Sequence, residues 1–263
     1  TAPPVALEGV TLQAAGGLAI LKWTRAADPD VRVAGNIVIR HSADTPATWA
    51  NSYSMDRVAG AEAIAVVPLK PGTYLLRAED SGGRLGPVTS VSTKGAQALT
   101  FTAVDQLQAD DQFLGTRTDV VLGPGGLQLA STLDETGVPH VPQREGLYVF
   151  AARLDFGAVR RVRLRSEIRV NVLALLDRID ARLDPIDAWA DFDGTDGAQT
   201  DVVLEVRESD DDPAGAARWS DWGRIDNHEV EARAIEARAW LRTEDAAYTP
   251  VVSRLRLYAD EVA

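Results

Sequence analysis

The chain has 263 residues, of which 45% are hydrophobic and 25% charged, with a formal net charge of −12 and no cysteine. These are ordinary values for a globular protein, and the length allows one large or two ordinary domains. The lack of cysteine excludes disulfides, thiolate nucleophiles and Cys-ligated zinc. No run of 18 apolar residues occurs, so no transmembrane helix and no insertion into a membrane are expected.

Charge is distributed unevenly along the chain. Residues 1–98 carry nine Lys and Arg against eight Asp and Glu, a net of +1, whereas residues 99–263 carry 18 against 31, a net of −13. This change supports two domains, which we place at 1–95 and 96–263. The acidic half disfavours nucleic acid and anionic membranes as partners, because like charges repel; solubility is the simpler role for the acidity. The N-terminal segment lacks the features of a signal peptide and an initiator Met, which suggests a piece of a longer polypeptide.

The first half reads as short strands separated by turns. Turns are expected at 28–30, 68–72 and 81–84, where Pro, Gly, Asp and Ser gather. Strands are expected at 18–23, 36–40, 63–67, 73–78 and 88–91. Regular short strands over about 90 residues predict an all-β sandwich.

The second half also predicts strands. Apolar and polar residues alternate over 147–156, 161–170, 200–207 and 251–258. In 161–170 the alternation is regular enough that a one-residue slip would bury four arginines, so the register is well fixed. The segment 229–242 is ambiguous, since its residues are good helix formers with apolar positions at helical spacing. We predict a strand there because of a family resemblance described below.

An acidic loop with two aromatic residues is expected near the middle of the second half. Asp191, Asp193 and Asp196 lie among glycines, and hard cations such as Ca²⁺ prefer several oxygen ligands within a tight turn. The spacing does not match an EF-hand loop. The loop is therefore a candidate Ca²⁺ site, with a solvated Asp/Gly turn as the commoner alternative; no other cofactor is expected.

Aromatic residues near expected loops are the candidates for contact with a receptor or a glycan. Tryptophan side chains can stack on sugars, but packing in the core is their more frequent role. The candidates are Trp49, Tyr53, Trp189, Phe192, Trp219 and Trp222.

No catalytic motif is visible. The three histidines are distant in sequence, and nucleophile elbows, P-loops, Rossmann fingerprints and zincin motifs are absent. Acid pairs suited to glycoside hydrolysis are unavoidable by chance in so acidic a chain. We therefore expect a protein that is not an enzyme.

Several motifs of the first half resemble a fibronectin type III module. Trp23 follows an apolar strand, as the core tryptophan of that family does. Leu69 with Pro71-Gly72-Thr73-Tyr74 resembles its L-x-P-G-T-x-Y corner, with Tyr74 one place early. Such modules usually position or bind other molecules.

The chain as a whole resembles the C-terminal part of the tail-tip attachment (host specificity) protein J family of long-tailed bacteriophages. The resemblance rests on an ordered set of segments over 63–258. These are the fibronectin-like corner, LDFGAV at 154–159, WADFDG at 189–194, ESDDDPAG at 208–215, WSDW at 219–222 and TPVV at 249–252. The family pattern "ARAFQFRLVLTSDD" matches the ambiguous segment and favours a strand, although this chain has fewer aromatic residues there.

The resemblance implies a non-catalytic, structural and host-receptor-contacting part of a phage or gene transfer agent tail tip or central fibre. It implies a homotrimer that assembles in the host cytoplasm with other tail-tip subunits and resides at the distal end of the virion tail. The receptor would be a glycan or an outer-membrane component, and the second domain a galactose-binding-like (discoidin or jelly-roll) sandwich. The alternative is a carbohydrate-binding module pair of a secreted bacterial glycoside-active protein.

Overall fold

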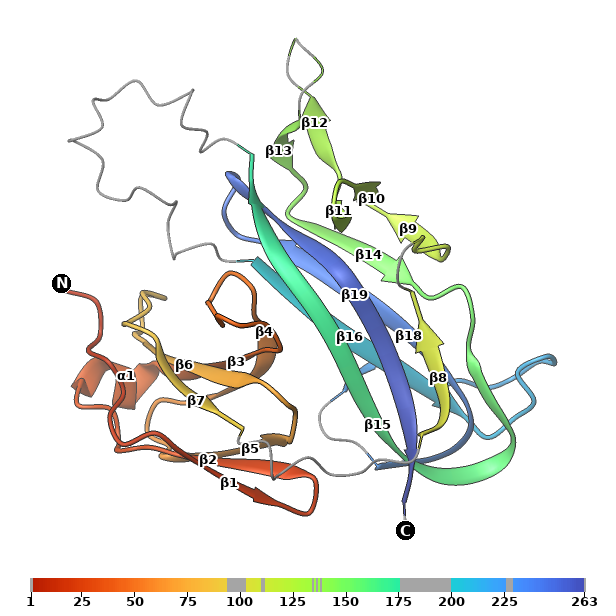
Figure 1. The fold of residues 1–263 in the computed structure, drawn as a ribbon, viewed down its shortest axis with the longest axis horizontal. Coiled ribbons are helices and arrows are strands. Elements are labelled where there is room, and N and C mark those ends of the chain that lie inside the picture. The colour runs from red at the N-terminus through yellow and green to blue at the C-terminus, as the bar shows by residue number, and fades with distance from the viewer. Residues whose placement is uncertain are drawn as a thin grey trace. The chain divides into compact units, whose positions relative to one another are not determined.

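The computed structural model describes residues 2–93, 103–109, 112–133, 135, 137, 139–175, 200–225 and 229–262. These residues form β-strands and one six-residue helix, which confirms the all-β prediction (Figure 1). The chain divides into two compact units, whose described residues lie in 2–93 and in 103–262. No helix in the described part of the chain is long and apolar enough to cross a bilayer.

The described residues of the first unit form seven strands and the helix. Their bounds are β1 Thr11–Ala15, β2 Leu18–Lys22, α1 Pro29–Ala34, β3 Asn36–Ser42, β4 Tyr53–Ala59, β5 Ile64–Pro68, β6 Thr73–Glu79 and β7 Thr89–Ser92. They form a three-stranded sheet, β1-β2-β5, and a four-stranded sheet, β4-β3-β6-β7. All pairs are antiparallel. This three-plus-four arrangement agrees with the expected fibronectin type III-like sandwich.

The core of the first unit is built from alternating residues of both sheets. Ala19 and Leu21 of β2 face the core from one sheet, and Ile37 and Ile39 of β3 face it from the other. Trp23 is buried beside them, and its indole N–H donates a hydrogen bond to the Glu62 carbonyl at 3.0 Å. The expected core tryptophan is therefore found with its polar atom satisfied, as burial of an indole requires.

The corner between β5 and β6 also has the expected chemistry. The Tyr74 hydroxyl donates to the Pro68 carbonyl at 2.6 Å and accepts from the Lys70 amide at 2.7 Å. Gly72 has φ +129°, and a Cβ there would lie 2.3 Å from the Ser42 carbonyl oxygen. Only glycine fits this turn. Burial, partly opposed by the Lys70 amide, raises the pKa of Tyr74 above its ordinary value.

Three elements of the first unit differ from the sequence predictions. The strands β1 and β4 were not expected, because β1 mixes small and polar residues with one leucine and β4 mixes apolar with polar and charged residues. The expected turn at 28–30 begins the one-turn helix α1, with Pro29 in its first turn, where proline is tolerated.

The second unit contains twelve strands in its described residues. Their bounds are β8 Ala103–Gln108, β9 Thr116–Thr118, β10 Val120–Gly123, β11 Gly126–Leu129, β12 Ser131–Leu133, β13 Pro139–Pro142, β14 Glu145–Val149, β15 Leu154–Ala174, β16 Thr200–Ser209, β17 Gly223–Arg224, β18 Glu229–Thr243 and β19 Tyr248–Glu261. The hairpin β12–β13 forms a separate two-stranded sheet. The predicted single strand over 147–156 is instead the end of β14 and the start of β15, separated by a turn.

The three longest strands, β15, β18 and β19, organise the second unit. One side is formed by β16, β18, β14 and β9, and the other by β15 and β19 with β8, β11 and β10 (Figure 1). The two sides are joined where the first half of β15 pairs with the start of β18. The result is a sandwich that is closed along one edge. Its core includes the inward residues of 161–170, namely Val162, Leu164, Ile168 and Val170, as predicted.

The ambiguous segment 229–242 is a strand, as predicted. β18 pairs with β16 over ten residues and with β14 and β15 on its other edge. Because β18 has a strand on each side, its backbone groups form hydrogen bonds along both edges. This outweighs the helical propensity of its Ala, Glu and Arg residues. The alternation of buried and exposed residues is interrupted once, because the neighbours Ala234 and Ile235 are both fully buried. From Ile235 onward every second residue is buried again, at Ala237, Ala239 and Leu241.

Candidate functional site

The outer face of β16 and β18 carries an unusual set of long side chains. The inner face is apolar, with Val202, Leu204 and Val206 of β16 buried. On the outer face, Glu205 lies directly opposite Arg238 and Arg207 directly opposite Glu236. Directly opposite residues in an antiparallel pair share a face, so these four charged groups form one row.

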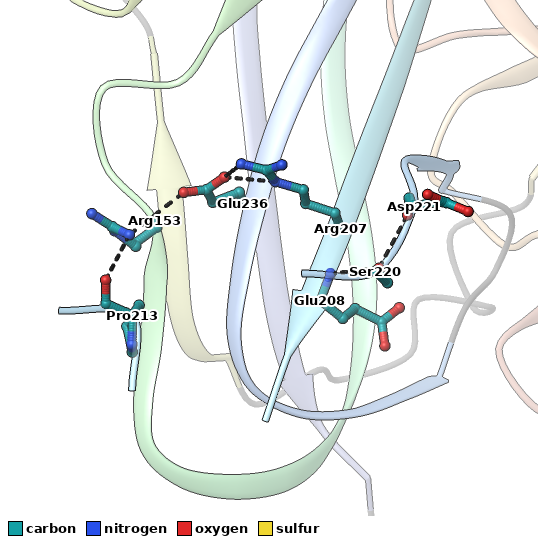
Figure 2. Close-up of polar contacts among 7 residues, drawn as sticks. All are labelled: Arg153, Arg207, Glu208, Pro213, Ser220, Asp221 and Glu236. Carbon is teal, nitrogen blue, oxygen red and sulfur yellow. Dashed lines mark hydrogen bonds and ion pairs between the residues drawn. The ribbon is translucent and has the colours of Figure 1, made fainter. Parts of the chain in front are cut away.

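The segment after the acidic turn folds back onto the edge of β16. The Ser220 amide donates to the Glu208 carbonyl at 2.9 Å, and the Glu208 amide donates to the Ser220 hydroxyl at 3.0 Å (Figure 2). Three residues after Ser220, β17 begins and pairs with Glu205 and Val206. These bonds fix Trp219 and Trp222 beside the charged row.

The tryptophans and arginines then alternate in space. The Arg207 guanidinium lies 5.1 Å from the ring centroid of Trp219 and 4.8 Å from that of Trp222. The Arg238 guanidinium lies 4.3 Å from the Trp222 centroid and 5.5 Å from that of Trp240. Arg242 continues the series over Trp240 at 5.5 Å. We call these six residues the Trp–Arg ladder.

Carboxylates hold the cations of the ladder in place. Arg207 donates to Glu236 through Nε at 2.8 Å. Glu205 accepts from Arg238 Nε at 2.7 Å and from the Trp240 indole N–H at 3.0 Å. Each central guanidinium is thus fixed by a carboxylate while it contacts two indoles, and cation–π contacts are strongest when the cation is held and partly desolvated. The three indoles are half-buried.

The acidic turn 209–215 is tied to the same network. Arg153 donates to the Pro213 carbonyl at 2.9 Å and lies 3.5 Å from Glu236 (Figure 2). Arg233 lies 2.9 Å from Asp212. The Ala214 amide and Arg233 together hold the pKa of Asp212 below its ordinary value. The segment is therefore a surface turn, as its composition predicted, and hydrogen bonds and ion pairs hold it to the neighbouring strands.

This arrangement is suited to recognition by contact. It offers a row of half-buried indoles whose orientation is fixed by guanidiniums and carboxylates. Two guanidiniums already lie over the Trp222 ring, so the face of that ring is less available to a ligand than the ring of Trp219, which has one. Within the residues that the structure describes, no group of three or more His, Asp or Glu could hold a metal ion.

The structure brings together only part of the set of aromatic candidates. Trp219 and Trp222 lie in the ladder. The prediction that Trp49 and Tyr53 contact a receptor or glycan is wrong, because they are 3% and 4% exposed. Tyr53 is the first residue of β4 and points inward, and Trp49 is covered by Arg40 and Arg77. The remaining candidates lie outside the described residues; these are Trp189, Phe192, Asp191, Asp193 and Asp196.

Sequence reasoning missed four members of the ladder and the two carboxylates that hold it; these are Arg207, Arg238, Arg242, Trp240, Glu205 and Glu236. The period-two pattern placed Glu205 and Arg207 on the wet face of their strand. The pattern did not show that β16 pairs with β18. The register of this pair is what puts Arg207 beside Glu236 and Arg238 beside Glu205. No known protein family model matches the chain, and no curated protein is significantly similar to it in sequence.

Proposed function

We propose that this chain is a structural and host-receptor-contacting part of a phage or gene transfer agent tail tip, and that it performs no catalysis. The Trp–Arg ladder is the observation that carries the proposal. The ladder includes both tryptophans of WSDW, and hydrogen bonds between Glu208 and Ser220 tie ESDDDPAG to the same surface. The two segments are among those on which the resemblance to the tail-tip attachment family rests. Such a surface suits contact with a partner.

Location is the first point to test. Antibodies raised against the purified chain should label the distal tip of tailed particles released by the source organism, as seen by immunogold electron microscopy. Labelling of secreted protein that sediments apart from particles, with none on tails, would contradict the proposal.

Receptor contact is the second point. The purified chain should compete with such particles for adsorption to susceptible cells. Trp219→Ala should weaken the competition, whereas Trp23→Phe, a conservative change at a buried core tryptophan, should leave it unchanged. Trp222 is less informative because its ring already contacts Arg207 and Arg238. If Trp219→Ala lowers only the melting temperature and competition persists, the ladder is structural and receptor contact lies elsewhere.

A carbohydrate-binding module pair is the second candidate function, and the half-buried ring of Trp219 favours it. Under that function the chain should bind soluble neutral glycans as a monomer, and Trp219→Ala should abolish binding in a glycan array. The burial of Trp49 and Tyr53 leaves the first unit without its expected sugar contacts, which weakens this alternative.

A further inference from the structure

The strand β5 of the first unit is an edge strand without a charged residue. Its sequence is Ile-Ala-Val-Val-Pro, and among the described residues it pairs only with β2. Ala65 and Val67 point into the core and are buried. Ile64 and Val66 point outward and are 44% and 51% exposed. An apolar edge of this kind pairs readily with another strand unless something protects it.

The other sheet edges of the first unit are less suited to pairing. Among its described strands the remaining edges are β1, β4 and β7. Each carries exposed polar or charged side chains, such as Gln13, Arg57 and Ser92. A partner that covered these groups would have to remove them from water, which opposes contact. On β5 the protecting residue is Pro68, at the end of the strand, and it leaves Ile64 and Val66 uncovered.

Backbone hydrogen bonds at both ends of the β2–β5 pair show which way the backbone of β5 faces. The Trp23 amide donates to the Ala63 carbonyl at 3.1 Å, and the Leu69 amide donates to the Gly17 carbonyl at 2.9 Å. In an antiparallel pair, successive residues alternate between bonding to the partner strand and facing away from it. The residues of β5 that bond to β2 are therefore the odd-numbered ones.

The even-numbered residues of β5 present their backbone to the free edge. Ile64 and Val66 each offer an N–H and a C=O group there. Pro68 has no N–H, and its carbonyl already accepts a hydrogen bond from the Tyr74 hydroxyl. The two residues with exposed apolar side chains are thus the two whose backbone groups face outward. Strand addition uses this combination, because main-chain bonds supply affinity and side chains supply specificity.

A further strand at this edge is compatible with the architecture. The first unit has three strands in this sheet and four in the other. Sandwiches of the immunoglobulin constant type have a fourth strand in the corresponding sheet, and it lies beside the strand that corresponds to β5. The chain's own strands leave that position open in the described part of the first unit.

A second copy of the chain fits this position by its charge and by its sequence. Residues 1–98 have a net charge of +1, so two first units meet without the repulsion expected between two copies of the acidic half. The strand is also self-complementary. In an antiparallel pair centred on Ala65, Ile64 of each copy lies directly opposite Val66 of the other. Both pairs then exchange backbone hydrogen bonds, and the four exposed side chains come into contact.

We propose that two copies of the chain pair through β5, antiparallel and with Ala65 on the two-fold axis. Such a contact is isologous, since it uses the same surface on both copies. A register centred on Val66 would instead place Ile64 opposite Pro68, which has no N–H to donate. The register centred on Ala65 therefore satisfies more backbone groups. The inference concerns the first unit and does not depend on the proposed tail-tip function.

Sedimentation equilibrium of the full chain tests the pairing and should show a dimer that forms as concentration rises. Val66→Lys and Ile64→Glu should each weaken it by at least about tenfold, because each replaces an apolar contact in both pairs by a buried charge. Val33→Lys makes the same kind of change in α1, at a position that is 86% exposed, and should leave the dimer unchanged.

A mixture of the two weakened variants tests the register. When the Ile64→Glu chain meets the Val66→Lys chain, one pair places the new carboxylate opposite the new ammonium. The other pair keeps valine opposite isoleucine. Opposite charges directly across a ladder attract, so the mixture should form a dimer although neither variant does so alone.

Hydrogen exchange of the unmodified chain gives a readout that requires no variant to fold. The amides of Ile64 and Val66 should exchange more slowly as the dimer forms, and those of the edge strand β7 should not change. The proposal is overturned if the chain stays monomeric up to its solubility limit, which would leave the edge to a different partner. It is also overturned if Val33→Lys weakens the dimer as much as Val66→Lys, if the mixture does not associate, or if a trimer forms that these variants leave intact.

Discussion

At the scale of single residues, His41 is the least ordinary group in the first unit. It is 2% exposed, and its ring makes edge contacts with Tyr53 and Tyr74. Neither ring nitrogen has a hydrogen-bond partner of good geometry among the described residues. Burial, and then the charge of Lys70, lower the pKa of His41 to about 3, and the nearby Pro71 backbone offsets this only in part.

The buried histidine predicts acid sensitivity. Because its folded-state pKa lies below the unfolded value of 6.5, the unfolded state binds the proton first as the pH falls. The effect of His41 on the free energy of unfolding is therefore constant above pH 6.5. Between pH 6.5 and about 3 it lowers the stability of the folded state progressively. By pH 5 the loss should be about 2 kcal/mol. Urea unfolding at pH 7 and 5 should show this loss, and His41→Leu should reduce it. His140→Leu, at an exposed position, should not; equal slopes for all three proteins would contradict the argument.

The second residue-scale prediction concerns Arg207, which contacts two indoles of the ladder and donates to Glu236. Arg207→Met keeps much of the side-chain volume and removes the charge. Two partly desolvated cation–π contacts are each worth about 1 kcal/mol, so unfolding free energy should fall by about 2 kcal/mol. Arg218→Met, at an exposed position of the same loop, is the control and should change stability little. A neutral effect of Arg207→Met would mean that the ladder is held by the backbone bonds of Ser220 alone.

At the scale of elements, β18 shows how local and global preferences compete. Its sequence is rich in Ala, Glu and Arg, which favour helix, yet it is a fifteen-residue strand. A synthetic peptide of residues 229–243 should therefore show no β signal in circular dichroism, and should gain helix in trifluoroethanol. Residues 161–175, from an alternating strand, provide the comparison peptide and should gain less helix. A peptide 229–243 that forms β structure alone would show that the strand is encoded locally.

The same element marks the limit of prediction from sequence. Strands with clear alternation, such as 161–170, were predicted with the correct face inward, because period-two patterning directly encodes burial. β1 and β4 were missed because their patterns are weak. The Trp–Arg ladder needs the cross-strand register of β16 and β18, which no local pattern contains. Tyr53 was misjudged because it proved to be the inward-facing first residue of a strand, and Trp49 because its loop is covered by Arg40 and Arg77.

At the scale of the whole molecule, the chain consists of two units that each have their own sheets and buried residues. Units of this kind usually unfold as separate cooperative transitions. The two also differ in charge, since residues 1–98 have a net charge of +1 and residues 99–263 a net charge of −13. Any property that depends on a group in one unit should therefore move only one of the transitions.

Calorimetry of the full chain should accordingly resolve two thermal transitions near neutral pH. On acidification to pH 5, the transition of the first unit should move down through His41, and His41→Leu should lessen that shift while leaving the other transition in place. Arg207→Met should lower the transition of the second unit and leave that of the first unit in place, because the ladder lies wholly in the second unit. A single transition that both variants shift together would show that the two units unfold as one cooperative body, and that energetic coupling rather than local composition sets the stability of this chain.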